Sequence, residues 1–209
     1  LDLETTTHRI AGRLPVIASH HIGLHHLPAW LRRFNREFPQ VELALQFMDS
    51  ESAFEQMRRR VCELAFVTLN DAMDQHFNVH EQWADPMVFV CGKTHPLADV
   101  RQPTLASLAP YSALLPDTGT ATYRVVSRLF LSEGLTLNPQ MPTNYLETLK
   151  MMTSVGLGWS VLPLKMTDES LVRLEVPHQL ERTLGAVGLA GRELSPAARA
   201  LLRIVKDMH

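Results

Sequence analysis

Hydroxyl, imidazole and carboxylate side chains gather at three points of the sequence where a helix is expected to begin. They are Ser19-His20-His21, Asp49-Ser50 and the loop Asp117-Thr118-Gly119-Thr120. Each follows a short apolar run that is typical of a buried strand. Free backbone amides at a helix start, just past the carboxyl end of a parallel strand, attract a small anion. The residue types therefore point to binding of a carboxylate or another small anion.

Hydrophobic periodicity predicts the elements that position these groups. Alternating or continuous apolar runs predict strands over Leu14–Ala18, Val41–Phe47 and Leu64–Val67. Between the first two strands, apolar residues at spacings of four, three and four predict one face of a helix: Leu27, Leu31, Phe34 and Phe38. A second helix is expected to begin near Asp49, Ser50 or Ser52, with Phe54, Met57 and Val61 buried. Strands and helices that alternate with short connections predict a parallel sheet with right-handed crossovers.

A second α/β unit follows in the middle of the chain. Its expected elements are an edge strand over Phe77–Trp83, strands over Met87–Cys91, Tyr111–Leu115, near Gln140–Pro142 and over Gly158–Pro163, and helices over Tyr123–Glu133 and Leu146–Val155. The tail adds strands over Leu171–Val176 and Leu184–Ala190 and a helix from Ser195. We predict an α/β fold of two lobes, with the second inserted in the first. Lobe I comprises residues 13–84 and 170–209, and lobe II comprises residues 85–169.

Composition limits the function classes. The chain has 209 residues, of which 45% are hydrophobic and 20% charged, as expected of a protein with a real core. The net charge of −2 argues against nucleic-acid binding by this part of the chain. No apolar run approaches the ~20 residues that span a membrane. Cys62 and Cys91 lie in apolar runs, which favours buried, reduced thiols in a reducing compartment. The polar start lacks a signal peptide, so we expect a piece of a longer cytoplasmic protein.

Several short motifs occur together in one order along the chain. They are His21-Ile22-Gly23 with Leu27-Pro28, the run from Phe34 through Phe38-Pro39-Gln40-Val41-Glu42-Leu43, then Glu63-Leu64-Ala65-Phe66-Val67, His95-Pro96-Leu97-Ala98 and Val155-Gly156-Leu157-Gly158-Trp159-Ser160-Val161-Leu162-Pro163. Each motif alone is weak, but five in this order are specific. Over nearly its whole length the chain resembles the effector-binding domain of bacterial LysR-type transcriptional regulators.

This resemblance implies a fold like that of type 2 periplasmic-binding proteins, with two Rossmann-like lobes of mixed sheet joined by crossover strands. It implies that a small effector binds between the lobes and that no cofactor is needed. Residues 1–12 would be the remnant of a linker helix to an N-terminal winged helix-turn-helix, through which alone the protein would contact DNA. The family also implies a homodimer, paired through lobe I, or a tetramer when full length, with no membrane partner.

The effector site is expected where the three helix starts converge. The candidate residues are Ser19, His20, His21, Ser50, Thr68, Thr118, Gly119, Thr120, Asn144 and Tyr145. The family commonly has a Ser or Thr where this chain has His21 and Ser50. Ser50 keeps the hydroxyl, whereas His21 replaces it with an imidazole that can become charged near neutral pH. This difference points to an anionic ligand or a pH-sensitive site.

Several of the candidate effector residues also have simpler structural explanations. Ser50 and Thr118 are equally well explained as helix N-caps. His21 and His25 are one helical turn apart, which raises the question of a metal site, but no carboxylate or thiol lies at ligand spacing nearby. We therefore expect no metal, and we expect His25 and His26 to be packing or surface residues of the helix.

Two other function classes compete with the regulator. A periplasmic solute-binding protein for transport would share the fold, although the absence of a signal peptide and the motif series favour the regulator. An enzyme is the third class, but the sequence has no nucleophile elbow, phosphate loop or paired carboxylates with a partner. We predict that the chain is not an enzyme.

Overall fold

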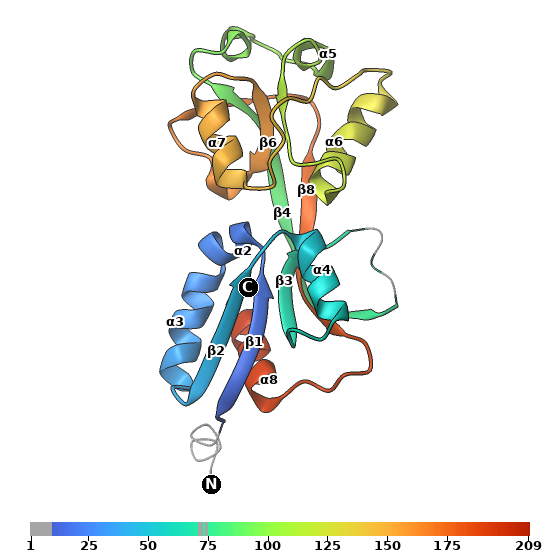
Figure 1. Ribbon diagram of the computed structural model, residues 1–209. Coiled ribbons are helices and arrows are strands. Elements are labelled where there is room, and N and C mark those ends of the chain that lie inside the picture. The colour runs from blue at the N-terminus through green and yellow to red at the C-terminus, as the bar shows by residue number, and fades with distance from the viewer. Residues whose placement is uncertain (1–9, 71–72, 74) are drawn as a thin grey trace. The chain divides into compact units, whose positions relative to one another are not determined.

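The computed structural model describes residues 10–70, 73 and 75–209, which form two compact units (Figure 1). Of the described residues, those up to Trp83 and Thr183–His209 form the first unit, and Ala84–Arg182 form the second. The linker-helix remnant expected at residues 1–12 lies almost wholly outside the described residues.

Three parallel strands form the centre of the first unit. They are β1 (Gly12–Ala18), β2 (Val41–Phe47) and β3 (Leu64–Thr68), in the order β2-β1-β3, and β8 (Leu180–Leu189) pairs antiparallel with β3. Ala18 at the end of β1 is in register with Phe47 of β2 and Phe66 of β3. The carboxyl ends of the three strands therefore lie at one edge of the sheet, as the strand–helix alternation predicts.

The described part of the first unit has four helices: α2 (His20–His25), α3 (Leu27–Glu37), α4 (Ser50–Arg58) and α8 (Pro196–Asp207). The single helix expected after Ser19 is thus two helices, since His26 interrupts it with φ −119° and ψ −48°. Pro28 lies in the first turn of α3, where its missing N–H is not needed.

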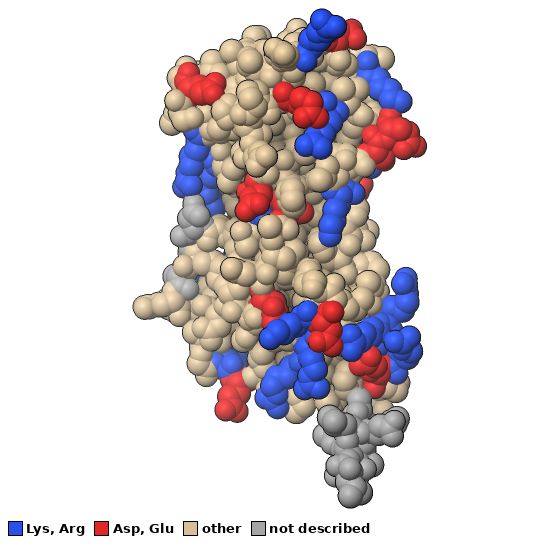
Figure 2. Space-filling model, turned by 180° about the vertical axis from the view of Figure 1, so that it is seen from behind, with Lys and Arg blue, Asp and Glu red and all other residues tan. Residues whose placement is uncertain are grey.

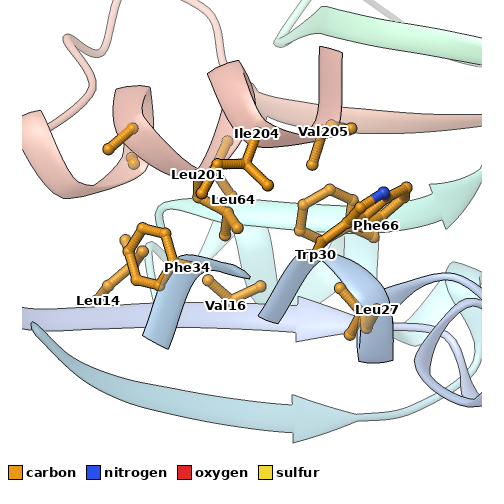
Figure 3. Packing of buried hydrophobic residues seen from close by; sticks show 14 of the residues in the cluster. Leu14, Val16, Leu27, Trp30, Phe34, Leu64, Phe66, Leu201, Ile204 and Val205 are labelled. Carbon is orange, nitrogen blue, oxygen red and sulfur yellow. The ribbon is translucent and has the colours of Figure 1, made fainter. Parts of the chain in front are cut away.

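The larger core of the first unit lies between α3, α8 and the sheet (Figure 3). Trp30 and Phe34 of α3 meet Leu201 of α8 there, and Phe34 and Leu201 are fully buried. On another side of the sheet, α4 buries Phe54 and Met57, whereas Val61, expected in the same stripe, follows the end of α4 and is 40% exposed. Burial of these faces supplies most of the stability of such helices.

A buried carboxylate explains how α8 begins. The N–H of Ser195 and, at 3.0 Å, its hydroxyl donate to the carboxylate of Glu63, and Ser195 is the N-cap of α8. Glu63 is 7% exposed and directly precedes β3. This residue therefore joins the start of β3 to the start of α8.

The second unit is built around one long strand. β4 (Phe77–Gly92) enters it from the first unit without a break and pairs antiparallel with both β6 (Trp159–Pro163) and β7 (Leu171–Leu174). A short strand, β5 (Ala113–Leu114), is parallel to β6. The helical segments are α5 (Leu105–Leu108), α6 (Ala121–Ser132), α7 (Leu146–Ser154) and two 3₁₀ turns, Pro96–Asp99 and Leu164–Met166.

Three sequence-based expectations differ from this arrangement. The two separate strands expected over Phe77–Cys91 are one strand, and β4 lies between β8 and β6 rather than at an edge. The strand expected near Gln140–Pro142 is replaced by an isolated parallel bridge between Ala113 and Pro139, in which the N–H of Ala113 donates to the carbonyl of Asn138 and the N–H of Gln140 donates to the carbonyl of Ala113. The return to the first unit, expected at residue 170, comes at Thr183, since β7 pairs with β4 inside the second unit.

Trp159 is the centre of the core of the second unit. It is fully buried, its ring stacks on Phe130 at 5.4 Å, and its Nε1–H donates to the carbonyl of Leu108 at 2.9 Å. A buried ion pair joins Arg182 Nε to Asp85 Oδ2 at 2.7 Å within the same unit. Both contacts satisfy polar groups that burial would otherwise make costly.

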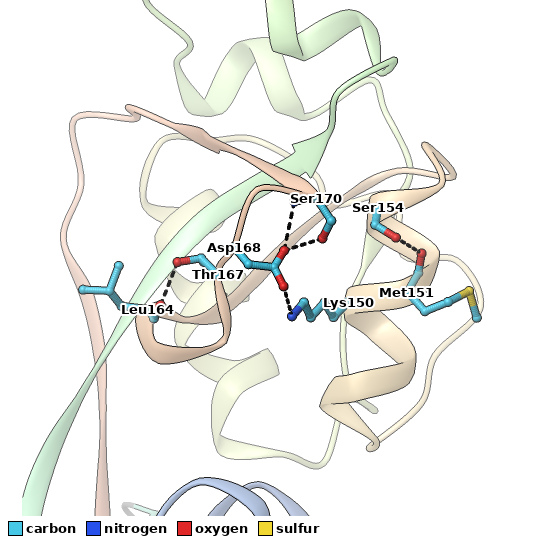
Figure 4. Close-up of polar contacts among 7 residues, drawn as sticks. All are labelled: Lys150, Met151, Ser154, Leu164, Thr167, Asp168 and Ser170. Carbon is cyan, nitrogen blue, oxygen red and sulfur yellow. Dashed lines mark hydrogen bonds and ion pairs between the residues drawn. The ribbon is translucent and has the colours of Figure 1, made fainter.

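The surface mixes charges of both signs. On the face that Figure 2 shows, Lys and Arg side chains are interspersed with Asp and Glu, in keeping with the net charge of −2. Figure 4 shows one such group, in which Lys150 Nζ lies 2.6 Å from Asp168 Oδ2 and the hydroxyl of Ser170 donates to Asp168 Oδ1. Among the described residues no helix is both long and apolar enough to cross a membrane.

Candidate functional site

The carboxyl edge of the parallel strands in the first unit collects the first group of predicted site residues. Ser19 directly follows β1, Ser50 follows β2 at the start of α4, and Thr68 is the last residue of β3. All three are buried, with 9%, 6% and 8% of their surface exposed. Sheet topology therefore brings together three hydroxyl-bearing residues that are far apart in the sequence.

Ser19 links the end of β1 to its neighbours. Its N–H donates to the carbonyl of Phe66 at 2.9 Å, and its Oγ is the N-cap that accepts the N–H of Ile22. Gly23 lies against the Phe47 ring so closely that a Cβ there would collide with it. The turn from β1 into α2 is thus fixed by local bonds and by the close approach of β2.

Ser50 bonds across the edge rather than along its own helix. Its Oγ accepts the N–H of Thr68 at 2.9 Å, and the N-cap of α4 is Asp49, whose carboxylate accepts the N–H and the hydroxyl of Ser52 at 2.8 and 2.9 Å. The N-cap explanation of Ser50 is therefore wrong, because Asp49 takes that role. A serine hydroxyl that accepts a bond retains its O–H as a donor, which is the group an anionic oxygen needs.

The histidines predicted for the site lie in α2. His20 is half-buried and its ring stacks on Phe47 with a centroid distance of 6.4 Å. His21 is 6% exposed, with the His25 ring at 4.9 Å and the His26 ring at 5.7 Å. His26 is buried beside the rings of Trp30 and Trp83, which is the packing alternative of the sequence-based expectation, although it lies at a break between two helices and not in one continuous helix.

The second group of predicted residues lies in the second unit, around the start of α6. Thr120 is the N-cap of α6, accepting the N–H of Tyr123 at 3.2 Å while its hydroxyl donates to the carbonyl of Asp117 at 2.8 Å. The N–H of Asp117 donates to Asn144 Oδ1 at 3.0 Å, so the loops at 117–120 and 144–145 are joined.

The remaining members of this second group are more exposed. Thr118 and Gly119 are exposed, and Tyr145 is 54% exposed. The N-cap role expected as an alternative for Thr118 belongs to Thr120. Arg124, which the sequence reading missed, donates from Nη1 to the carbonyl of Gly119 at 2.8 Å. The sequence contains a signal for this contact, because Arg124 follows the N-cap Thr120 by one helical turn and so carries its positive charge close to the loop.

The second unit also has an open cavity of about 490 Å³ away from these loops. Its lining includes Met87, Phe89, Arg173, His178 and Leu180. None of the predicted effector residues lines this cavity. The cavity is therefore separate from the predicted effector site and is an alternative place for a ligand to bind.

The fold and the polar side chains at the ends of the parallel strands define the class of protein. It is a two-unit α/β ligand-binding domain. The chain belongs to the family described as LysR substrate binding domain, whose sequence model matches residues 7–209. It is thus the effector-binding domain of a LysR-type transcriptional regulator, as the motif series indicated. The family is not a known class of enzyme, and nothing in the match supports the transport alternative.

Individual relatives agree with this assignment. The transcriptional regulator YeiE of Escherichia coli K12 is 26% identical over 211 residues, covering 97% of this chain and 70% of the relative. The effector-binding domain of QuiR, solved in complex with shikimate, has a TM-score of 0.84 at 16% identity and covers 95% of this chain and 97% of its own. The regulatory domain of CcmR from Synechocystis PCC6803, solved in complex with 2-PG, has a TM-score of 0.81 at 21% identity. The match covers 94% of this chain and 97% of the CcmR chain.

Proposed function

We propose that this domain senses a small anion and that the carboxyl edge of β1, β2 and β3 supplies its principal binding groups. The observation that carries the proposal is the bond from the Thr68 N–H to Ser50 Oγ, which holds the Ser50 hydroxyl at the strand ends beside Ser19. Buried hydroxyl donors at such an edge suit a carboxylate or phosphate oxygen. His20 and His21, on the helix that begins there, are the remaining candidates in this unit.

In the second unit, the candidate contacts are Thr118, Gly119, Thr120, Asn144 and Tyr145. The bond between Asp117 and Asn144 supports their grouping, and the guanidinium of Arg124 adds a positive charge at the same loop. The structural neighbours QuiR and CcmR were solved in complex with shikimate and with 2-PG, which supports a small molecule as the effector.

Effector binding would control transcription by shifting a conformational equilibrium. A ligand shifts such an equilibrium only by its differential affinity for the two states. The shift would change how the N-terminal winged helix-turn-helix domains of the full-length regulator are spaced on paired DNA half-sites. The regulator would act in the cytoplasm.

We further propose that the domain forms a homodimer through its first unit, or a tetramer when full length. The candidate surfaces are the outer faces of α3 and of α8 near Arg199, since a two-fold dimer uses one patch on both copies. Sedimentation equilibrium at high protein concentration should give the mass of a dimer. A monomer under those conditions would contradict this part of the proposal.

A thermal-shift screen of the purified domain tests the effector class. The compounds are small carboxylates, phosphorylated acids, amino acids and aromatic acids, each with an uncharged amide or alcohol analogue as its matched control. A ligand at one hundred times its Kd adds ~2.7 kcal/mol of stability, which is readily measured as a rise in Tm. We expect stabilisation by one anion and not by its uncharged analogue. Stabilisation by uncharged compounds alone would refute the anion proposal.

A further inference from the structure

The effector proposal makes no use of the cavity in the second unit. The volume of this cavity, about 490 Å³, lies within the roughly 300–1,000 Å³ that small-molecule sites occupy. All of its lining residues belong to Ala84–Arg182, so the cavity is complete within one unit. It is therefore a candidate for a second ligand site, separate from the strand ends of the first unit.

An interruption of the sheet accounts for the cavity. β7 and β8 both pair with β4, but the chain between them, residues 175–179, is not part of a strand. It makes two tight turns instead, in which the N–H of Val176 donates to the carbonyl of Leu174 at 2.8 Å and the N–H of His178 donates to the carbonyl of Val176 at 2.7 Å. Because these N–H groups bond within the segment, the segment does not extend the pairing of β7 with β4. The cavity is lined by this segment and by residues 86–89 of β4.

Most of the cavity lining is apolar. Met87 and Phe89 of β4 and Leu174 of β7 are 7%, 3% and 5% exposed and belong to the core of the second unit. Apolar surface that a ligand removes from water against such a lining contributes about 25 cal/mol per Å². The cavity therefore suits a molecule with an apolar body.

The charged side chains of the lining leave one negative charge without a partner. Arg173 Nε lies 3.5 Å from Glu175 Oε1, so these two lining residues form an ion pair. His178 Nε2 lies 2.9 Å from Oε1 of Glu133, which is outside the lining. Glu181, the remaining charged residue of the lining, has no ion pair within the described part of the chain. A cationic group on a ligand would supply the opposite charge.

We propose that this cavity binds a small organic ammonium ion with an apolar body, such as an arylalkylamine. The ammonium group pairs with the carboxylate of Glu181, and the apolar body packs on Met87, Phe89 and Leu174. This class of ligand is opposite in charge to the anion proposed for the ends of β1, β2 and β3, so the two sites respond to different compounds. A second ligand with a higher affinity for one conformation of the domain shifts the same equilibrium as the effector. The proposal goes beyond the proposed function and uses no residue of the effector site.

An NMR titration with phenethylamine tests the site, with 2-phenylethanol and 3-phenylpropanoate as the uncharged and anionic controls. The domain carries methionine labelled with ¹³C at its ε-methyl, because Met87 lines the cavity, whereas Met57 is buried in the first unit. We expect a saturable shift of the Met87 signal, assigned with Met87→Leu, and none of the Met57 signal. The alcohol should bind about fivefold more weakly than the amine, which is the upper end of what an exposed ion pair contributes, and the acid more weakly still.

Two variants locate the bound amine. Glu181→Gln keeps the shape of the side chain but removes its charge, so the amine should bind about fivefold more weakly, as the alcohol does. The matched control is Glu169→Gln, an exposed carboxylate of the same unit outside the lining, which should keep the wild-type Kd. Leu164→Trp enlarges a side chain that lines the cavity and is 40% exposed, so it should block binding and leave the fold intact.

The proposal is overturned if the Met87 signal does not shift saturably, or if the acid binds more tightly than the amine. Equal Kd values of the amine for the wild type and Glu181→Gln, or unchanged binding in Leu164→Trp, would also overturn it. Ser50→Ala should leave amine binding unchanged. The anion screen can therefore fail while the amine binds, and the reverse, so failure of the one proposal is distinguishable from failure of the other.

Discussion

Replacing Ser50 with alanine tests the structural role of its hydroxyl in the ligand-free domain. The change removes the Oγ that accepts the Thr68 N–H at 2.9 Å, in a place where Ser50 is 6% and Thr68 8% exposed. A buried N–H left without an acceptor costs ~1–3 kcal/mol. For a chain of 209 residues each kcal/mol lowers Tm by about 2–4 °C. We therefore expect the ligand-free Ser50→Ala domain to melt about 2–12 °C below the wild type.

Two measurements check this expectation. Urea unfolding of the ligand-free domain gives the loss of stability, and hydrogen exchange of the Thr68 amide should become faster than that of amides elsewhere in β3. The matched control is Ser132→Ala, whose exposed hydroxyl donates only to the carbonyl of Leu129 one turn earlier and whose loss should stay within about 0.5 kcal/mol. Equal stabilities of Ser50→Ala and the wild type, with unchanged Thr68 exchange, would refute the reasoning.

Three further predictions concern other parts of the molecule. The ammonium of Lys150 and the bonds from Ser170 hold the pKa of Asp168 well below its usual range, so Lys150→Met should raise that pKa in an NMR titration; an unchanged value would show that the ion pair is not formed in solution. The stabilisation from Asp168 is present above its unfolded pKa near 3.9 and is lost as pH falls through the lower folded value. Burial raises the pKa of Cys62 and of Cys91 to about 11, so both should be almost entirely thiols at pH 8 and react with Ellman's reagent only on unfolding; fast reaction of the native domain would contradict this. Leu201→Ala should cost about 2–5 kcal/mol in urea unfolding, since the side chain is fully buried between α3 and the sheet, and a loss below 1 kcal/mol would contradict that packing.

The sequence predicted most of the helices and strands, because these elements depend on residues that are close together in the sequence. The apolar run of β1, the alternation of β2 and the Ser195 cap of α8 each depend on residues close in sequence, and the structure has them where they were expected. β4 was missed as one strand because Pro86 interrupts its apolar pattern, whereas its pairing with strands from distant parts of the chain decides its length.

The candidate site likewise has features that the sequence predicted and features that it did not. The strand-end rule indicated Ser19, Ser50 and Thr68, and the parallel sheet brings them to one edge. The bond between Ser50 and Thr68 and the burial of His26 against Trp83 depend on non-local packing, which periodicity does not report. A sequence signal for His26 exists only in retrospect, in the proline two residues later that favours a new helix start.

The most direct test of the account is a crystal structure of the domain with the best anion from the thermal-shift screen. We predict that an anionic oxygen of the ligand lies within hydrogen-bond distance of Ser50 Oγ, with Ser19 or Thr68 as a second contact. A ligand bound instead in the 490 Å³ cavity of the second unit, with the edge of β1, β2 and β3 uncontacted, would contradict the central claim.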